Sequence, residues 1–254
     1  MRDYNAILER IKKARELARN AEPVPEPVYE CPKCKDSGMI MYKDAEGRDF
    51  GKWCECREKR LALSLMKSSG ITEEDTKKGF ADFETFGESG LVFAKQTAAR
   101  YVKAFAEIRD TRNNSLLLCG ASGRGKTTLG MAVANSLIKS CVGVRYMPYR
   151  DEMTRLKQEI TDDFTYTEHM NKLKSAKVLF IDDLLKGKIT ESDVNILYEI
   201  LNYRYLERLP VIISTEKLTN ELLEFDEAIG SRILEMCKGF VVTFDKSIPN
   251  YRLR

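Results

Sequence analysis

The sequence predicts an α/β fold in which helices flank a parallel sheet, with a small cysteine-rich module and a helix on its N-terminal side. Three observations support this prediction. From about residue 80 onward, short apolar runs alternate with amphipathic stretches, as in strand–helix–strand units. A G-x-x-x-x-G-K-[ST] motif at 120–127 lies between one such run and one such stretch. Four cysteines form two close pairs within residues 29–58.

Composition divides the chain into four segments. Apolar side chains recur at helical spacing near the start, which predicts an amphipathic helix over residues 1–22. Alternating prolines follow at Pro23–Pro27 and favour an extended spacer. The cysteine module is expected over 29–60, a largely polar linker over 61–79, and the α/β domain over 80–254.

The overall charge limits the possible partners. The chain has 254 residues, with 42 basic and 39 acidic side chains, so nucleic-acid binding requires a local basic patch. No apolar run reaches membrane-spanning length, and the charged N-terminus lacks the apolar core of a signal peptide. We therefore expect a cytoplasmic protein with no membrane partner, whose seven cysteines are reduced or metal-bound.

The four N-terminal cysteines bracket two candidate strands and a turn, the layout of a zinc ribbon. Four thiolates form a closed tetrahedral site, so we expect structural Zn²⁺ on Cys31, Cys34, Cys54 and Cys56. An iron–sulfur cluster and ordinary reduced thiols are the alternatives. The remaining cysteines lie in or beside apolar runs and are expected to fill the core, whereas the single histidine is expected at the surface: Cys119, Cys141, Cys237 and His169.

The α/β domain contains a phosphate-binding loop between the expected strand Ser115–Cys119 and a helix. Its glycines let backbone N–H groups converge on the phosphates of ATP or GTP, and the helix N-terminus adds a favourable dipole. Lys126 contributes a point charge and Thr127 a hydroxyl ligand for Mg²⁺. The expected nucleotide-binding residues are Gly120, Ala121, Ser122, Gly123, Arg124, Gly125, Lys126, Thr127 and Thr128.

Two adjacent carboxylates end the apolar run Val178–Ile181, at the edge where open α/β sheets bind ligands. Asp182 is expected to hold Mg²⁺, and Asp183 to act as the general base on the attacking water. A solvated pair of aspartates is the alternative. Glutamate is more usual at the second position, and the shorter aspartate favours slow or partner-stimulated hydrolysis.

Two later residues are further candidates. Thr215 follows the expected strand Pro210–Ser214 and is placed to sense the γ-phosphate, ahead of Ser214; a plain turn is the alternative. Arg232 begins a short helix before the expected last strand, Phe240–Phe244. An arginine there can reach the γ-phosphate of a neighbouring subunit, although a surface salt bridge explains it equally simply.

In this order and spacing, these elements resemble AAA+ ATPases of the initiator and helicase-loader branch, and most closely the DnaC/DnaI-like loaders of phages and mobile elements. Segments 182–188, 199–205 and 226–233 carry the resemblance, which extends over 80–254. The cysteine module also resembles that of DnaI-type loaders. The resemblance implies ATP rather than GTP, Arg232 as an arginine finger acting in trans, and Arg252 as a weaker sensor candidate.

The same resemblance implies the partners of a primosome component in DNA replication. The N-terminal region, residues 1–60, would bind the replicative hexameric helicase, and the α/β domain would self-associate. Single-stranded DNA would contact the excursion 148–175 and the residues after the acidic pair. The candidate DNA contacts are Tyr149, Arg150, Arg155, Lys157, Phe164, Tyr166, Lys186 and Lys188.

These features predict an ATP-dependent loader of the replicative helicase onto single-stranded DNA. One alternative is an IstB-like transposition helper ATPase, which keeps the motor and changes the client protein. A P-loop small-molecule kinase is a second, and it would need an acceptor pocket but no trans-acting Arg232. A third is a scaffold that tethers partners without hydrolysis, for which Asp183→Asn would be harmless.

Overall fold

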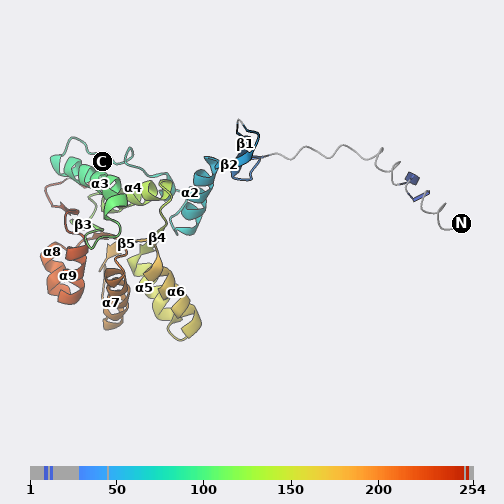
Figure 1. The fold of residues 1–254 in the computed structure, drawn as a ribbon. Helices are drawn as coiled ribbons and strands as arrows, with labels where there is room; N and C mark the ends of the chain where they lie inside the picture. The colour runs from blue at the N-terminus through green and yellow to red at the C-terminus, as the bar shows by residue number, and fades with distance from the viewer. Residues whose placement is uncertain (1–8, 11, 14–28, 45, 249, 252–254) are drawn as a thin grey trace. The chain divides into compact units, whose positions relative to one another are not determined.

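The computed structural model describes residues 9–10, 12–13, 29–44, 46–248 and 250–251 (Figure 1). Apart from those four early residues, the expected helix over 1–22 lies outside the described part, and so does Arg252. The chain forms two compact units, residues 1–57 and 58–254. Among the described residues, no helix has both the length and the apolar character needed to cross a bilayer.

The first unit contains the expected hairpin. Strands β1 (Met39–Lys43) and β2 (Asp49–Trp53) pair antiparallel in a register that runs from Met39 opposite Trp53 to Lys43 opposite Asp49. The Asp44 carboxylate closes the turn by accepting the Arg48 backbone N–H at 2.8 Å. Both strands leave their side chains partly or fully exposed, so the described hairpin builds no apolar core.

A five-stranded parallel sheet forms the centre of the second unit and confirms the predicted fold class. Its strands follow the order β4-β5-β6-β3-β7. Most of their side chains are apolar and buried on both faces, as covered parallel sheets require. The strands are β3 (Leu116–Gly120), β4 (Val144–Pro148), β5 (Val178–Leu184), β6 (Val211–Thr215) and β7 (Val241–Phe244).

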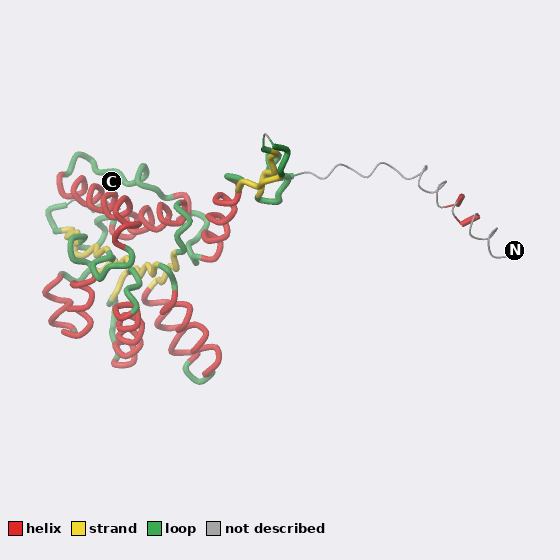
Figure 2. The backbone as a smooth tube through the Cα atoms, in the orientation of Figure 1, coloured by secondary structure: helices red, strands yellow, loops and turns green. Residues whose placement is uncertain are grey.

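Helices cover both faces of this sheet (Figures 1 and 2). One apolar cluster joins the sheet to α3 and α4, and a second joins it to α5 through α9. The helices are α2 (Cys56–Ser68), α3 (Ser89–Ile108), α4 (Lys126–Lys139), α5 (Tyr149–Glu159), α6 (Asp163–Ser175), α7 (Glu191–Leu206), α8 (Thr219–Phe225) and α9 (Glu227–Met236).

The stretch expected as a linker, 61–79, is folded onto the second unit. Apolar side chains of α2 pack against the α3–α4 cluster. The Tyr146 backbone N–H donates to the carbonyl of Ser69 at 2.7 Å. The Asn135 amide donates to two carbonyls of the stretch, each at 2.7 Å, on Asp75 and Lys78. The stretch is therefore part of the second unit, held by hydrogen bonds to its backbone that the polar composition does not indicate.

A fully buried arginine connects α7 to the end of α6 and to the residue before β6. Arg204 of α7 donates from its guanidinium to backbone carbonyls at the end of α6 and before β6. Burial lowers the pKa of Arg204 to about 9. Because a buried cation is costly without partners, these hydrogen bonds fix the junction between the helix and the strand. The four accepting carbonyls belong to Leu173, Lys174, Ala176 and Pro210.

Candidate functional site

The phosphate loop joins β3 to α4, in the expected strand–loop–helix order. Three of its glycines, Gly120, Gly123 and Gly125, have φ of 113°, 71° and 87°, in the left-handed region that favours glycine. At Gly120 a Cβ would also lie 2.2 Å from the Phe244 carbonyl oxygen. Glycine there lets the loop approach the end of β7 closely.

Lys126 extends into this loop. Its side chain is buried, and Nζ donates to the carbonyl oxygens of Gly120 and Ala121, both at 2.8 Å. Burial lowers the pKa of Lys126, and the carboxylates of Glu216 and Asp183 oppose that shift. The ammonium group therefore lies against the loop carbonyls, where a phosphate oxygen would compete with them for its hydrogen bonds.

Side-chain oxygen atoms from β4, β5 and β6 lie close to the hydroxyl of Thr127, the residue after Lys126. The Thr127 hydroxyl donates to Asp182 Oδ1 at 2.9 Å, and the Tyr146 hydroxyl donates to Asp182 Oδ2 at 3.1 Å. The Ser214 hydroxyl donates to Asp182 Oδ1 from β6. Burial raises the pKa of Asp182. Thr127 and Asp182 thus present adjacent hard oxygens, the ligand type that Mg²⁺ takes beside a phosphate.

The tip of β6 presents its two hydroxyls differently. Ser214 Oγ contacts Asp182 and also accepts the Asp183 backbone N–H at 2.9 Å. Thr215, expected as the γ-phosphate sensor, instead donates to the Leu184 carbonyl at 2.8 Å and is buried. Ser214 is therefore the β6 hydroxyl that contacts the acidic pair. Successive side chains of a strand point to opposite faces, so only one of the two hydroxyls contacts the acidic pair. Which one does so depends on the register of β6 against β5, which the sequence alone does not give.

A cavity of about 70 Å³ opens between the loop and the end of β5. Asp183, at φ 55°, lies at an irregularity within β5, and its Oδ2 accepts from Lys186 Nζ at 2.8 Å. Lys186, expected as a DNA contact, lines this cavity instead. The lining residues are Ser122, Gly123, Gly125, Lys126, Thr127, Thr128, Asp183, Lys186 and Tyr251.

Tyr251 is a cavity residue that sequence analysis missed. Its backbone N–H donates to the Gly123 carbonyl at 2.6 Å, and its hydroxyl accepts the Glu84 N–H at 2.9 Å. The ring stacks on Phe83 with centroids 5.5 Å apart. An aromatic residue far along the sequence gives no local signal that it will reach the loop.

Arg232 projects from α9 onto α7. Its Nε donates to Asn202 Oδ1 at 3.1 Å, and its guanidinium lies 5.2 and 5.5 Å from the ring centroids of Tyr198 and Tyr205. It is absent from the described residues that line the phosphate cavity. At Gly230 a Cβ would approach a carbonyl of α8 to 2.6 Å, so glycine allows α8 and α9 to pack closely.

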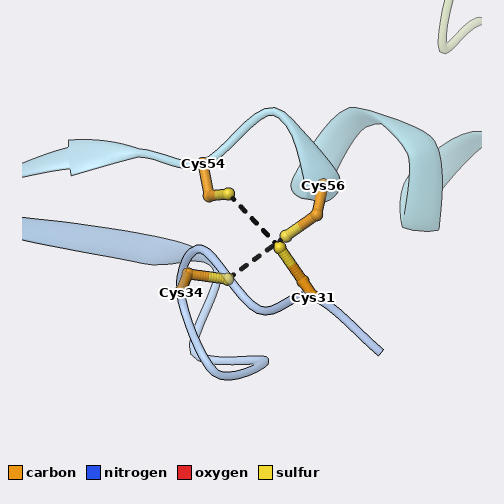
Figure 3. Close-up of side chains that lie close together, drawn as sticks. All are labelled: Cys31, Cys34, Cys54 and Cys56. Carbon is orange, nitrogen blue, oxygen red and sulfur yellow. Dashed lines mark hydrogen bonds between the residues drawn. The ribbon is translucent and has the colours of Figure 1, made fainter. Parts of the chain in front are cut away.

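The four N-terminal cysteines converge as expected (Figure 3). Their sulfur atoms all lie within 4.8 Å of one another, with Cys31–Cys54 at 3.7 Å and Cys34–Cys56 at 3.4 Å. Zinc–thiolate bonds of about 2.3 Å in a tetrahedron place sulfurs about 3.8 Å apart, so the cluster fits Zn²⁺. Burial opposes ionisation of Cys34, but hydrogen bonds, led by that with Cys56, lower its pKa to about 7.

The structure reduces the number of residues that are exposed enough to contact DNA. Tyr149 is buried, so its expected stacking role is wrong. Lys157 pairs with Asp193 at 2.8 Å, and Tyr166 packs on the core. Phe164, at the start of α6, is 79% exposed. The more exposed aromatic and basic candidates on these helices are Arg150, Arg155 and Phe164.

His169 is buried, which corrects the expectation of a surface residue. Its Nδ1 and Nε2 each lie 2.7 Å from a carboxylate oxygen, of Glu159 and Glu152 respectively. The ring therefore links α5 to α6. Cys119 and Cys237 are buried as expected, while Cys141 is only partly buried.

Comparisons with known proteins agree with this geometry. A family model described as IstB-like ATP binding protein matches residues 56–238. The Phage-like element PBSX protein XkdC of Bacillus subtilis (strain 168) is 36% identical over 95% of this chain and 92% of its own length. The uncharacterized protein YqaM of the same organism is 34% identical over 89% of this chain and 86% of its own.

Solved structures show the same fold at low sequence identity. A crystal structure of DnaI has a TM-score of 0.57 and 24% identity, covering 69% of this chain and 94% of DnaI. The DnaC helicase loader has a TM-score of 0.54 and 19% identity, with coverages of 68% and 99%. The replication initiator DnaA, bound to AMPPCP and single-stranded DNA, has 0.55 and 22%, with coverages of 66% and 50%.

Proposed function

The chain belongs to the family of IstB-like ATP binding proteins and is an ATPase of the AAA+ fold, and from this premise we propose that it loads the replicative DNA helicase onto single-stranded DNA. One observation supports the proposal above the others. A single chain combines a nucleotide unit shaped like those of DnaI and DnaC with a separate four-cysteine unit. A motor joined to a separate module suits a protein that acts on a client.

In this proposal ATP is held by the chain's own groups at the loop. Backbone N–H groups and Lys126 would bind the phosphates, and Thr127 and Asp182 would hold Mg²⁺, which would supply positive charge beside the transferring phosphoryl group. Asp183 orients the attacking water. Ser214 fixes the acidic pair by contacting the Asp182 carboxylate and the Asp183 backbone together.

Arg232 would complete the site of a neighbouring subunit. Its contacts on α7 and its absence from the described lining of its own phosphate cavity support action in trans. Subunits joined in this way assemble head to tail, as a ring or spiral. Mixing Arg232→Ala with Lys126→Ala subunits should restore ATPase activity that each variant lacks alone. A mixture as inactive as its parts would contradict the shared site.

The remaining regions would contact the clients. The N-terminal region, residues 1–60, would bind the helicase, and Zn²⁺ on the four cysteines would fix the shape of the hairpin within it. Exposed aromatic and basic side chains on α5 and α6, Phe164 first among them, would contact single-stranded DNA in the cytoplasm.

A loading assay tests the proposal directly. The full-length protein and the host's replicative hexamer are added to circular single-stranded DNA that carries an annealed oligonucleotide and is coated with single-strand binding protein. We expect ATP-dependent release of the oligonucleotide by the helicase, and none with Lys126→Ala. Equal release with and without the protein would overturn the proposal.

An IstB-like transposition helper is the second candidate, and the description of the matching family model favours it. The ATPase unit would be the same, but the client would be a transposase. ATP-dependent binding to the transposase of the same mobile element, without helicase loading, would select this function. Loss of either function in Asp183→Asn would also exclude a scaffold that needs no hydrolysis.

A further inference from the structure

Lys186 has a position that neither nucleotide binding by the loop nor DNA binding explains. Its ammonium lies 2.8 Å from Asp183 Oδ2 and 3.4 Å from Glu216 Oε1, and it lines the phosphate cavity. We propose that Lys186 binds the γ-phosphate in its own subunit, and that it leaves Asp183 when it does so. This inference rests on ATP binding at the loop, and is independent of the client protein.

The backbone at the end of β5 and just after it directs this lysine toward the cavity. Asp183, Leu185 and Gly187 all have positive φ, of 55°, 60° and 86°, and the Lys186 N–H donates to the Asp183 carbonyl at 3.1 Å. Leu184 and Leu185 are buried and anchor the turn. The base of the lysine is therefore fixed, whereas its side chain is 42% exposed and free to change partner.

Charge balance provides the reason for a change of partner. A triphosphate carries more negative charge than one Mg²⁺ and one lysine neutralise. Lys126 and Lys186 are the cationic side chains among the described residues that line the cavity. Hydrogen bonding to Asp183 raises the pKa of Lys186, so the side chain is charged at neutral pH. Half-exposed ion pairs contribute little stability, so a γ-phosphate can displace this one.

This exchange would link the general base to the nucleotide. With an empty or ADP-bound site, Lys186 neutralises Asp183 and holds its carboxylate. When a γ-phosphate takes the ammonium, the Asp183 carboxylate becomes available to the attacking water. Glu216, whose hydrogen bond with Ser122 lowers its pKa, stays ionised beside the loop and keeps the lysine close.

Equilibrium binding of AMPPCP and ADP to the full-length protein, by calorimetry, tests the assignment. Lys186→Ala should weaken AMPPCP about tenfold and change ADP by less than about twofold, because one charge-assisted hydrogen bond is lost. Lys186→Arg should retain most of the preference. Lys103→Ala, on an exposed position of α3, is the matched control and should change neither affinity.

Two results would overturn the assignment: a ratio of AMPPCP to ADP affinity that Lys186→Ala leaves unchanged, or an equal loss for both nucleotides. Failure of the wild-type protein to bind any nucleotide would instead remove the ATP site itself. If Lys186 provides the preference for AMPPCP over ADP but the protein loads no helicase, the assignment of Lys186 holds and only the proposed function is contradicted.

A double-mutant cycle tests the exchange between partners. Asp183→Asn removes the repulsion between the Asp183 carboxylate and the γ-phosphate whether or not Lys186 is present. When Lys186 is present, the same substitution also releases the Lys186 ammonium from its ion pair. We therefore expect Asp183→Asn to raise AMPPCP affinity at least about threefold more with Lys186 than with Ala at this position. Additive effects would show that the ion pair does not compete with nucleotide.

Discussion

The two units of the chain differ in how much apolar surface they bury. In the cysteine unit both strands of the hairpin are exposed, and four sulfur atoms lie within 4.8 Å of one another. In the α/β unit two apolar clusters fill both faces of a sheet, and Arg204 is fully buried. We expect a metal cross-link to stabilise the short cysteine unit, which buries little apolar surface, whereas the longer unit folds by burial.

Removing the metal should produce the largest difference between the units. Chelation, or Cys34→Ser, should unfold the cysteine unit and leave the α/β unit folded. Trp53, the only tryptophan, lies on β2 with the Arg57 guanidinium 4.0 Å from its ring centroid, and so reports on this unit alone. Its fluorescence intensity should change because the contact with Arg57 is lost, while thermal unfolding followed by far-UV circular dichroism stays unchanged.

Metal content supplies the control for that experiment. Wild-type protein should contain about one equivalent of zinc, as should Cys141→Ser, which alters a cysteine outside the cluster. Zinc well below half an equivalent in pure wild-type protein, or a Trp53 spectrum that ignores chelation, would show that the hairpin does not depend on metal.

Arg204→Met should act on the opposite unit. The change removes the buried guanidinium that donates to four backbone carbonyls, so we expect a loss of about 3–5 kcal/mol in the free energy of unfolding. Urea unfolding followed by circular dichroism measures it, and Trp53 emission in the folded protein should not change. The control Arg109→Met, at the exposed ion pair with Asp110, should cost under about 0.5 kcal/mol. Equal costs for the two variants would contradict the role of burial.

Tyr251 should give the smallest effect, because it supports the loop indirectly, through its contacts with Gly123 and Phe83. Tyr251→Ala removes the stack on Phe83, so AMPPCP binding should weaken by about 1 kcal/mol, or roughly fivefold. Tyr251→Phe keeps the ring and loses only the hydroxyl that accepts the Glu84 N–H, so it should fall between Ala and wild type. An alanine variant that binds AMPPCP more tightly would show that the residue obstructs the site.

Local patterns in the sequence predicted what depends on local structure. The parallel strands follow from continuous apolar runs, and the close cysteine pairs follow from a hairpin that brings them together. The phosphate loop follows from its glycines, since residues of positive φ stand where the motif places them. Each of these features is encoded within a few neighbouring residues.

What the sequence did not indicate depends on contacts between distant segments. Tyr146 and Ser214 reach Asp182 because β4 and β6 flank β5, an order that no single segment specifies. The stretch 61–79 was mistaken for a linker because its partner, Asn135, lies on a distant helix. Lys186 is positioned by a segment in which Asp183, Leu185 and Gly187 have positive φ, and two of these three residues are not glycine.

The most direct test of the central claim is complex formation with the client. Purified full-length protein and the host's purified replicative helicase hexamer are mixed with and without ATP and separated by size-exclusion chromatography. We predict a complex of the two proteins that ATP stabilises and that Lys126→Ala weakens. Separate elution of the two proteins both with and without ATP would contradict a helicase loader.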